Sequence, residues 1–143
     1  MFWLALALHI LGYDLWFYVS HRLLHTRLLT RFHGIHHQRP RPMWLDTYHG
    51  HWTEGPFQSA GFLLPLAFGI WSWPAALVGV AATTLRGCAR HETRLAPWLG
   101  NHHLLHHLSP SYNYGEFWLD TLCGTRVPER ALEDAGVLGP LRI

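Results

Sequence analysis

The sequence contains no lysine, only two cysteines and few charged residues of either sign. All eleven basic residues among the 143 are arginine, and charged residues make up 14% of the chain. A formal net charge of +2 is too small to indicate nucleic-acid binding. Cys88 and Cys123 do not have CxxC spacing, so the sequence indicates neither a disulfide framework nor a thiolate zinc site, and we expect two reduced, packed thiols.

Long apolar runs are abundant instead. Residues 1–20 form a nearly uninterrupted apolar segment that is long enough to cross a bilayer. A signal peptide is the alternative, but the segment has no basic start, no small-residue cleavage site and many aromatic side chains. A membrane-spanning helix is therefore favoured.

A second apolar segment, residues 57–85, contains no charged residue. It is longer than one span and shorter than two spans of about 20 residues each, so we expect two short helices, 57–71 and 74–90, joined by a turn at Trp71–Pro74. Five arginines lie between positions 22 and 41, three between 86 and 94, and none between 42 and 85. The positive-inside rule then predicts that both flanks of this hairpin face the cytoplasm. A buried helical pair in a soluble core is the alternative.

Histidine spacing is the most informative feature of the sequence. Five histidines lie within HRLLHTRLLTRFHGIHH (21–37), and four more within NHHLLHH (101–107). If the first helix continues beyond Ser20, then Asp14, Tyr18, His21 and His25 lie along one stripe of it. A carboxylate in an apolar span needs a partner, and we expect Asp14 to accept the N–H of a metal-bound imidazole. Capping of another helix end is the alternative role for Asp14.

Two histidine triplets share the spacing HxxHH: His33, His36 and His37, and His103, His106 and His107. On a helix the first and third members share a face, while the middle member points about 100° away and can reach a neighbouring metal. Together with His21 and His25 the triplets provide eight imidazoles, which is more than one ion can use, so two metals are predicted. Neutral imidazole suits iron, zinc, copper and nickel alike. His9 has no partner at ligand spacing, and we expect no functional role for it.

The motifs DLWFYVSHRLLH, RFHGIHH, HHLLHH and NYGEFWLDTLCGT resemble those of the fatty acid hydroxylase and sterol desaturase superfamily, over about Gly12 to Thr125. The resemblance implies an all-α integral-membrane helical bundle: one catalytic domain, 1–143, with a transmembrane hairpin and a cytoplasmic, histidine-rich helical cap that holds a dimetal site. A multi-pass protein of the endoplasmic reticulum, or of the inner membrane if bacterial, is expected. The doubled histidine box and the segment YHGHWTE resemble sterol-oxidising members most.

The resemblance also assigns roles residue by residue. Asp14 corresponds to the acidic residue before the first box. The expected metal ligands are His21, His25, His33, His36, His37, His91, His103, His106 and His107. A structural role is implied for the closing run Asn113, Tyr114, Gly115, Asp120, Gly124 and Thr125.

The chain departs from its relatives at two places. The stretch RGCARH, which ends at His91, lacks a further ligand that many relatives carry, and His49, His51 or Asn101 could supply it. Relatives also have apolar helices upstream, so a minimal member or a fragment lacking those helices is expected.

The implied cofactors are two iron ions, which zinc can replace, with O2 as co-substrate. The implied reaction is hydroxylation or desaturation of a membrane lipid, sterol-like ahead of fatty acyl. Because the sequence has no flavin, haem or iron–sulfur motif, we expect electrons from cytochrome b5 or from a ferredoxin with its reductase. The alternatives are a non-catalytic, histidine-rich membrane metal-binding protein and, less favoured, a metal-dependent hydrolase.

Overall fold

The computed structural model describes residues 1–128, and this part of the chain contains helices and loops but no strand. The expected all-α class is therefore confirmed. In chain order the elements are α1 (Phe2–Leu24), α2 (Thr30–His33), η1 (His36–Gln38), η2 (Trp44–Tyr48), α3 (Glu54–Ser59), η3 (Ala60–Phe68), α4 (Trp73–His91), η4 (Thr93–Leu95), α5 (Ala96–Leu99), α6 (His102–Leu108) and α7 (Phe117–Leu122), where η denotes a 3₁₀ helix.

Helix α1 is the only helix within residues 1–128 that is long and apolar enough to cross a membrane. Its 23 residues extend about 34 Å at 1.5 Å per residue, slightly more than the hydrocarbon core of a bilayer. Apart from Arg22 in the last turn, the exposed side chains of α1 are apolar, among them Leu4, Leu11, Leu15, Val19 and Leu23. An outer face of this kind suits lipid contact.

Of the two helices predicted for the hairpin, the second is confirmed and the first is wrong. The second helix is present as α4, with Pro74 in the first turn and the Ser72 hydroxyl accepting the N–H of Ala75 at 3.4 Å. The predicted helix 57–71 is absent, because α3 ends at Ser59 and η3 follows as a 3₁₀ helix. Pro65 explains the break, since it has no N–H to donate and its ring crowds the carbonyl of Gly61 four residues earlier.

Helix α1 and η3 touch through their backbones at two glycines. A Cβ built on Gly12 would lie 2.5 Å from the Gly61 oxygen, and a Cβ on Gly61 would lie 2.4 Å from the Gly12 oxygen. Any larger residue at either position would push the two elements apart. Glycine is therefore required here by close packing.

His9 is fully buried in the same contact, where its Nδ1 lies 2.9 Å from the Phe62 carbonyl oxygen. A carbonyl can only accept, so Nδ1 carries the proton and donates. In a 3₁₀ helix the Phe62 carbonyl would accept from residue 65, which is a proline without an N–H. His9 satisfies this carbonyl, so it has a structural role that its isolated position in the sequence did not reveal.

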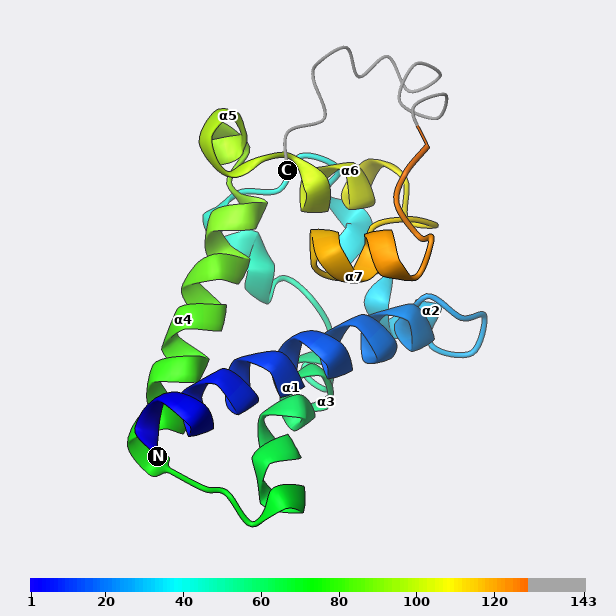
Figure 1. Ribbon diagram of the computed structural model, residues 1–143. Coiled ribbons are helices and arrows are strands. Elements are labelled where there is room, and N and C mark those ends of the chain that lie inside the picture. The colour runs from blue at the N-terminus through cyan, green and yellow to red at the C-terminus, as the bar shows by residue number, and fades with distance from the viewer. Residues whose placement is uncertain (129–143) are drawn as a thin grey trace.

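The arrangement of the helices brings the histidine motifs to one place. Helices α1 and α4 meet near the N-terminus of the chain and diverge from there, while α6 and α7 lie over the C-terminal half of α1 (Figure 1). An ion pair between Asp14 of α1 and Arg86 of α4 links the two long helices. The histidines therefore gather between the C-terminal ends of α1 and α4 and helix α6.

Candidate metal centre

The nine histidines expected as metal ligands lie in two adjacent groups. Within each group, one ligand nitrogen per residue lies within 4.8 Å of all the others. Group one consists of His21, His25, His33, His37 and His106, and group two consists of His36, His91, His103 and His107. These groups are the candidate sites for two metal ions.

Each HxxHH box contributes to both groups in the expected alternation. In the second box His33 and His37 belong to group one and His36 to group two. In the third box the order reverses, because His103 and His107 belong to group two and His106 to group one. The second box achieves this without one continuous helix, since α2 ends at His33 and η1 begins at His36. The histidine spacing therefore predicts which residues group together even where the expected helix is interrupted.

Five of these imidazoles have a fixed tautomer. Their Nδ1 atoms face oxygen atoms that can only accept: His21 faces Tyr114 O (2.5 Å), His33 faces Glu54 Oε2 (2.5 Å), His36 faces His49 O (2.9 Å), His91 faces Gly87 O (2.8 Å) and His106 faces Tyr112 O (2.5 Å). Each Nδ1 therefore carries the proton. In the neutral imidazole the other nitrogen, Nε2, is then left with a bare lone pair.

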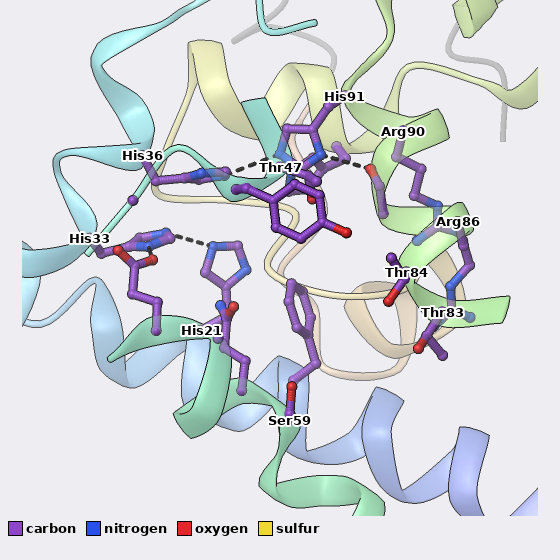
Figure 2. A pocket seen from close by; sticks show the side chains of 18 of the residues that line it. His21, His33, His36, Thr47, Ser59, Thr83, Thr84, Arg86, Arg90 and His91 are labelled. Carbon is purple, nitrogen blue, oxygen red and sulfur yellow. Dashed lines mark hydrogen bonds and ion pairs between the residues drawn. The ribbon is translucent and has the colours of Figure 1, made fainter. Parts of the chain in front are cut away.

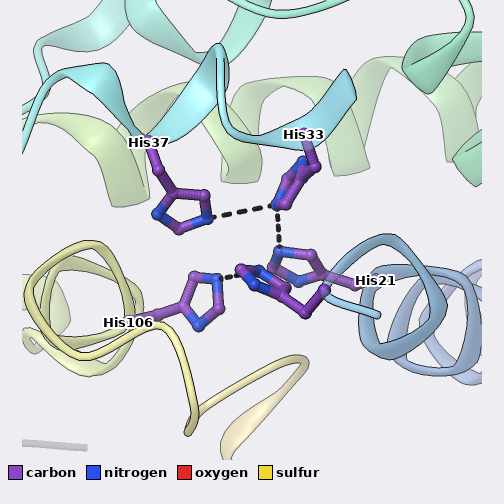
Figure 3. Close-up of side chains that lie close together, drawn as sticks. His21, His33, His37 and His106 are labelled. Atoms are coloured by element: carbon purple, nitrogen blue, oxygen red, sulfur yellow. Dashed lines mark hydrogen bonds between the residues drawn. The ribbon is translucent and has the colours of Figure 1, made fainter. Parts of the chain in front are cut away.

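Each group contains two such unprotonated Nε2 atoms close to each other. In group one the Nε2 atoms of His21 and His33 are 2.9 Å apart (Figure 3), and in group two those of His36 and His91 are 3.1 Å apart. Neither member of a pair has a proton to donate, so the contact is repulsive unless a cation lies between them. Two imidazole ligands at 2.0–2.1 Å from one metal, at right angles, would place their nitrogens about 3 Å apart. Both groups therefore fit a metal ion.

Protonation of the imidazoles is opposed by their surroundings. Burial, followed by the nearby imidazole of His33, lowers the pKa of His25 to about 3. Burial and the neighbouring His91 lower the pKa of His36 to about 4, and burial and His36 lower that of His107 to about 2. At neutral pH these side chains are uncharged, which is the form that binds metal. Nε2 of His107 is also buried and has no hydrogen-bond partner within residues 1–128, as expected of a free ligand atom.

Glu54 is the carboxylate that orients a candidate ligand. Burial raises its pKa, but hydrogen bonds from His33 and from the backbone N–H of His51 (2.9 Å) outweigh burial and leave the pKa lowered. It is therefore ionised at neutral pH and holds the proton of His33 on Nδ1. Sequence reasoning used YHGHWTE only for the family resemblance and gave Glu54 no role; its position three residues after His51 was the available signal.

The expected role of Asp14 is not observed. Its carboxylate accepts from both terminal nitrogens of Arg86, and no described imidazole bonds to it. The physical reason is that Arg86, four helical turns into α4, reaches Asp14 across the contact between α1 and α4. Arg86 also approaches Glu116, which in turn accepts from Arg90.

The closing run has a structural role. Asp120 is fully buried and accepts the N–H groups of Tyr114 and Gly115, both at 2.9 Å, and the hydroxyl of Thr125 at 2.7 Å. His102 bonds to the same carboxylate at 2.9 Å, which explains its presence beside the third box without a place in either group. Because Asp120 fixes the backbone at Tyr114, it also fixes the Tyr114 carbonyl, which accepts the hydrogen bond from Nδ1 of His21.

The residues considered as substitutes for a missing ligand lie outside both groups. His49 provides its backbone carbonyl to His36, and Nδ1 of His51 lies 2.8 Å from the Thr53 hydroxyl. The Asn101 side-chain oxygen is buried and has no hydrogen-bond partner among the described residues. The described groups thus consist of five and four imidazoles.

A cavity of about 330 Å³ borders both groups. Tyr13 and Phe17 of α1 and the ring of Trp52 provide apolar surface. The opposite wall is more polar. Figure 2 shows the side chains of this wall on α4, facing the imidazoles: Thr83, Thr84, Arg86 and Arg90.

Comparison with known proteins identifies the family. A family model described as fatty acid hydroxylase matches residues 6–125, which is most of the chain. The chain belongs to the fatty acid hydroxylase family. The resemblance drawn from the histidine boxes to this superfamily is thereby confirmed. Members are membrane-associated oxidoreductases, typically iron-dependent, that hydroxylate or desaturate lipids. No solved structure matches the chain.

Proposed function

We propose that the protein is a membrane-bound, O2-dependent oxygenase that uses two iron ions to hydroxylate or desaturate a lipid. The observation that carries the proposal is the pair of closely spaced, unprotonated Nε2 atoms in each histidine group, His21 with His33 and His36 with His91. Nitrogen donors of this type bind iron, and a cavity adjoins both groups. All nine histidines of the two groups would serve as ligands.

The residues of the chain provide geometry and shelter. Bound iron would supply the reduction of O2 and the removal of hydrogen from an unactivated C–H bond. Glu54 and the backbone carbonyls of Tyr114 and His49 hold protons on Nδ1, which keeps the Nε2 lone pairs of their imidazoles available. Burial of His21 and His33 keeps bulk water away from this face of the cavity.

The substrate and the setting extend the proposal. We favour a sterol-like lipid over a fatty acyl chain, because HHLLHH and YHGHWTE resemble sterol-acting relatives. We further propose a multi-pass arrangement with the histidine groups on the cytoplasmic side, supported by the arginines at 22–41 and 86–94 that flank the uncharged segment. We also place the C-terminal tail on the cytoplasmic side; residues 129–143 lie outside the part of the chain that the structure describes. Cytochrome b5 or a ferredoxin with its reductase would donate electrons.

The test combines metal content with lipid chemistry. The full chain, expressed in cells that lack the endogenous enzymes, should contain two metal ions per chain by elemental analysis. Mass spectrometry of the lipids should show a new oxygen or double bond that requires both O2 and an electron donor. One metal or none per chain would contradict the dinuclear site. Two bound irons without any O2-dependent lipid change would favour the alternative, a non-catalytic metal-binding protein.

His106 and His9 provide a matched pair of variants. His106→Ala removes a group-one ligand and should abolish the lipid change and lower the metal content. His9→Ala should retain both metals, because His9 is in neither group, although the lost bond to Phe62 should lower thermal stability. Equal loss of metal from both variants would contradict the distinction between ligand and structural histidines.

A further inference from the structure

The outward surface of residues 43–85 carries no charged side chain. Only Asp46 and Glu54 are charged within this stretch, and both are buried. Each is paired within the chain, since Asp46 pairs with Arg39 and Glu54 with His33. An uncharged surface over 43 consecutive residues is unusual for a protein face in contact with water.

This surface includes more than the apolar helices. The segment 43–52 lies outside the long helices, yet its exposed side chains are apolar or aromatic: Met43, Trp44, Leu45, Tyr48 and Trp52, of which Leu45 is 70% and Trp52 79% exposed. Exposed Arg41 lies two residues before the segment. Trp and Tyr with a neighbouring arginine are the composition of a membrane interface, where rings lie at headgroup level and the cation meets phosphate.

The same segment borders the metal centre. Tyr48 and Trp52 line the cavity that touches both histidine groups, and both rings are largely exposed. We propose that segment 43–52 inserts into the interfacial layer of the bilayer, and that Tyr48 and Trp52 form the mouth through which a lipid reaches the cavity. The passage of a substrate rests on the proposed function, whereas the insertion of the segment does not.

A lipid surface fits this face better than a protein partner does. Exposed apolar residues also occur on the neighbouring apolar elements, at Leu63 of η3 and at Leu77 and Leu85 of α4. A bilayer around α4 would cover its exposed leucines together with the exposed side of η2. η2 packs against α4, so its exposed side lies directly beside the lipid-facing side of that helix.

Depth-dependent quenching tests the insertion. Cys88 is packed as expected, but Cys123 is exposed, so the full chain carries Cys123→Ser to remove that thiol. It is labelled with a fluorophore at Leu45→Cys or Trp52→Cys and placed in phosphatidylcholine–phosphatidylglycerol vesicles. Leu28→Cys is the matched control, because Leu28 is also a highly exposed residue but follows Arg27 in a charged part of the cap. Nitroxide-bearing lipids should quench positions 45 and 52 several-fold more than position 28, while aqueous iodide should show the reverse order.

Two results would overturn the insertion. One is preferential quenching of positions 45 and 52 by iodide, which would place the segment in water. The other is protection from both quenchers that disappears when the protein is diluted in lipid, which would indicate a second copy of the chain on this face.

Kinetics test the mouth separately. Trp52→Ala should raise KM for the lipid several-fold and leave kcat and the content of two metals unchanged, and Trp52→Phe should restore most of the KM. An unchanged KM in Trp52→Ala would overturn the assignment of the mouth. A wild-type protein without turnover would refute the proposed function, and the quenching result would still decide the insertion.

Discussion

Removal of the Glu54 carboxylate should weaken the binding of one metal ion and leave the binding of the other unchanged. Glu54 bonds only to His33 of group one among the candidate ligands. In Glu54→Ala the proton of His33 is free to move from Nδ1 to Nε2, which would occupy the lone pair that a metal needs. Group two keeps its own orienting bonds, from His36 to the His49 carbonyl and from His91 to the Gly87 carbonyl.

Loss of such an orienting partner typically reduces metal affinity 10–100-fold, which corresponds to about 1.4–2.7 kcal/mol. A chelator titration of the purified protein, followed by elemental analysis, should therefore become biphasic. One metal should leave Glu54→Ala at about 10–100-fold lower free chelator than the wild type requires. The second metal should leave at the wild-type concentration. Glu54→Gln retains an acceptor oxygen without the charge and should lie between the two.

Asp46→Asn is the matched control. Asp46 is a carboxylate buried to the same extent, but it accepts from Arg39 and from the Met43 N–H, and no candidate ligand bonds to it. This variant should lose stability and retain both metals with wild-type affinity. If Glu54→Ala lost both metals together, or neither, the division into two groups with separate orienting partners would be refuted.

Three further variants and conditions have defined outcomes. Unfolded histidines bind protons below about pH 6.5, whereas the pKa values of His25 and His36 in the folded protein are about 3 and 4. The metal-free protein should therefore lose thermal stability as pH falls from 6.5 to 4. A melting temperature that rises over this range would contradict the prediction. Gly12→Val should destabilise the protein by about 1–3 kcal/mol or prevent folding, and Gly55→Ala, with nothing within 4 Å of the added Cβ, should be nearly neutral in the same detergent melting assay. Asp14→Asn should keep both metals by elemental analysis and lower stability through the weakened bond to Arg86; loss of metal would restore its predicted role.

The histidine grouping could be predicted because it depends on spacing within short segments. Positions 33, 36 and 37 divide between the two groups as α-helical spacing predicts, with 33 and 37 together and 36 apart, although α2 ends at His33 and η1 begins at His36. The start of α4 could also be predicted, because Pro74 and Ser72 are local signals. These features require no knowledge of distant contacts.

Features that depend on distant contacts could not be read in this way. Asp14 was paired with histidines on its own helix, but Arg86, 72 positions later, is its partner. The carbonyls that hold His21 and His36 belong to loops, and a backbone carbonyl leaves no trace in the residue type. The break at Pro65 was visible in the sequence, but the apolar composition of residues 57–71 outweighed it in the prediction.

The distribution of ligands between elements implies that the two candidate metals depend on different helices. Helix α1 and its C-cap provide His21 and His25 to group one only, and α4 provides His91 to group two only. The two HxxHH boxes contribute to both groups and therefore join them. The relative position of the groups is then set by how α1 packs on α4, where His9 lies beside Gly79. A membrane that restricts the relative movement of α1 and α4 would stabilise the spacing of the metals as well as the fold.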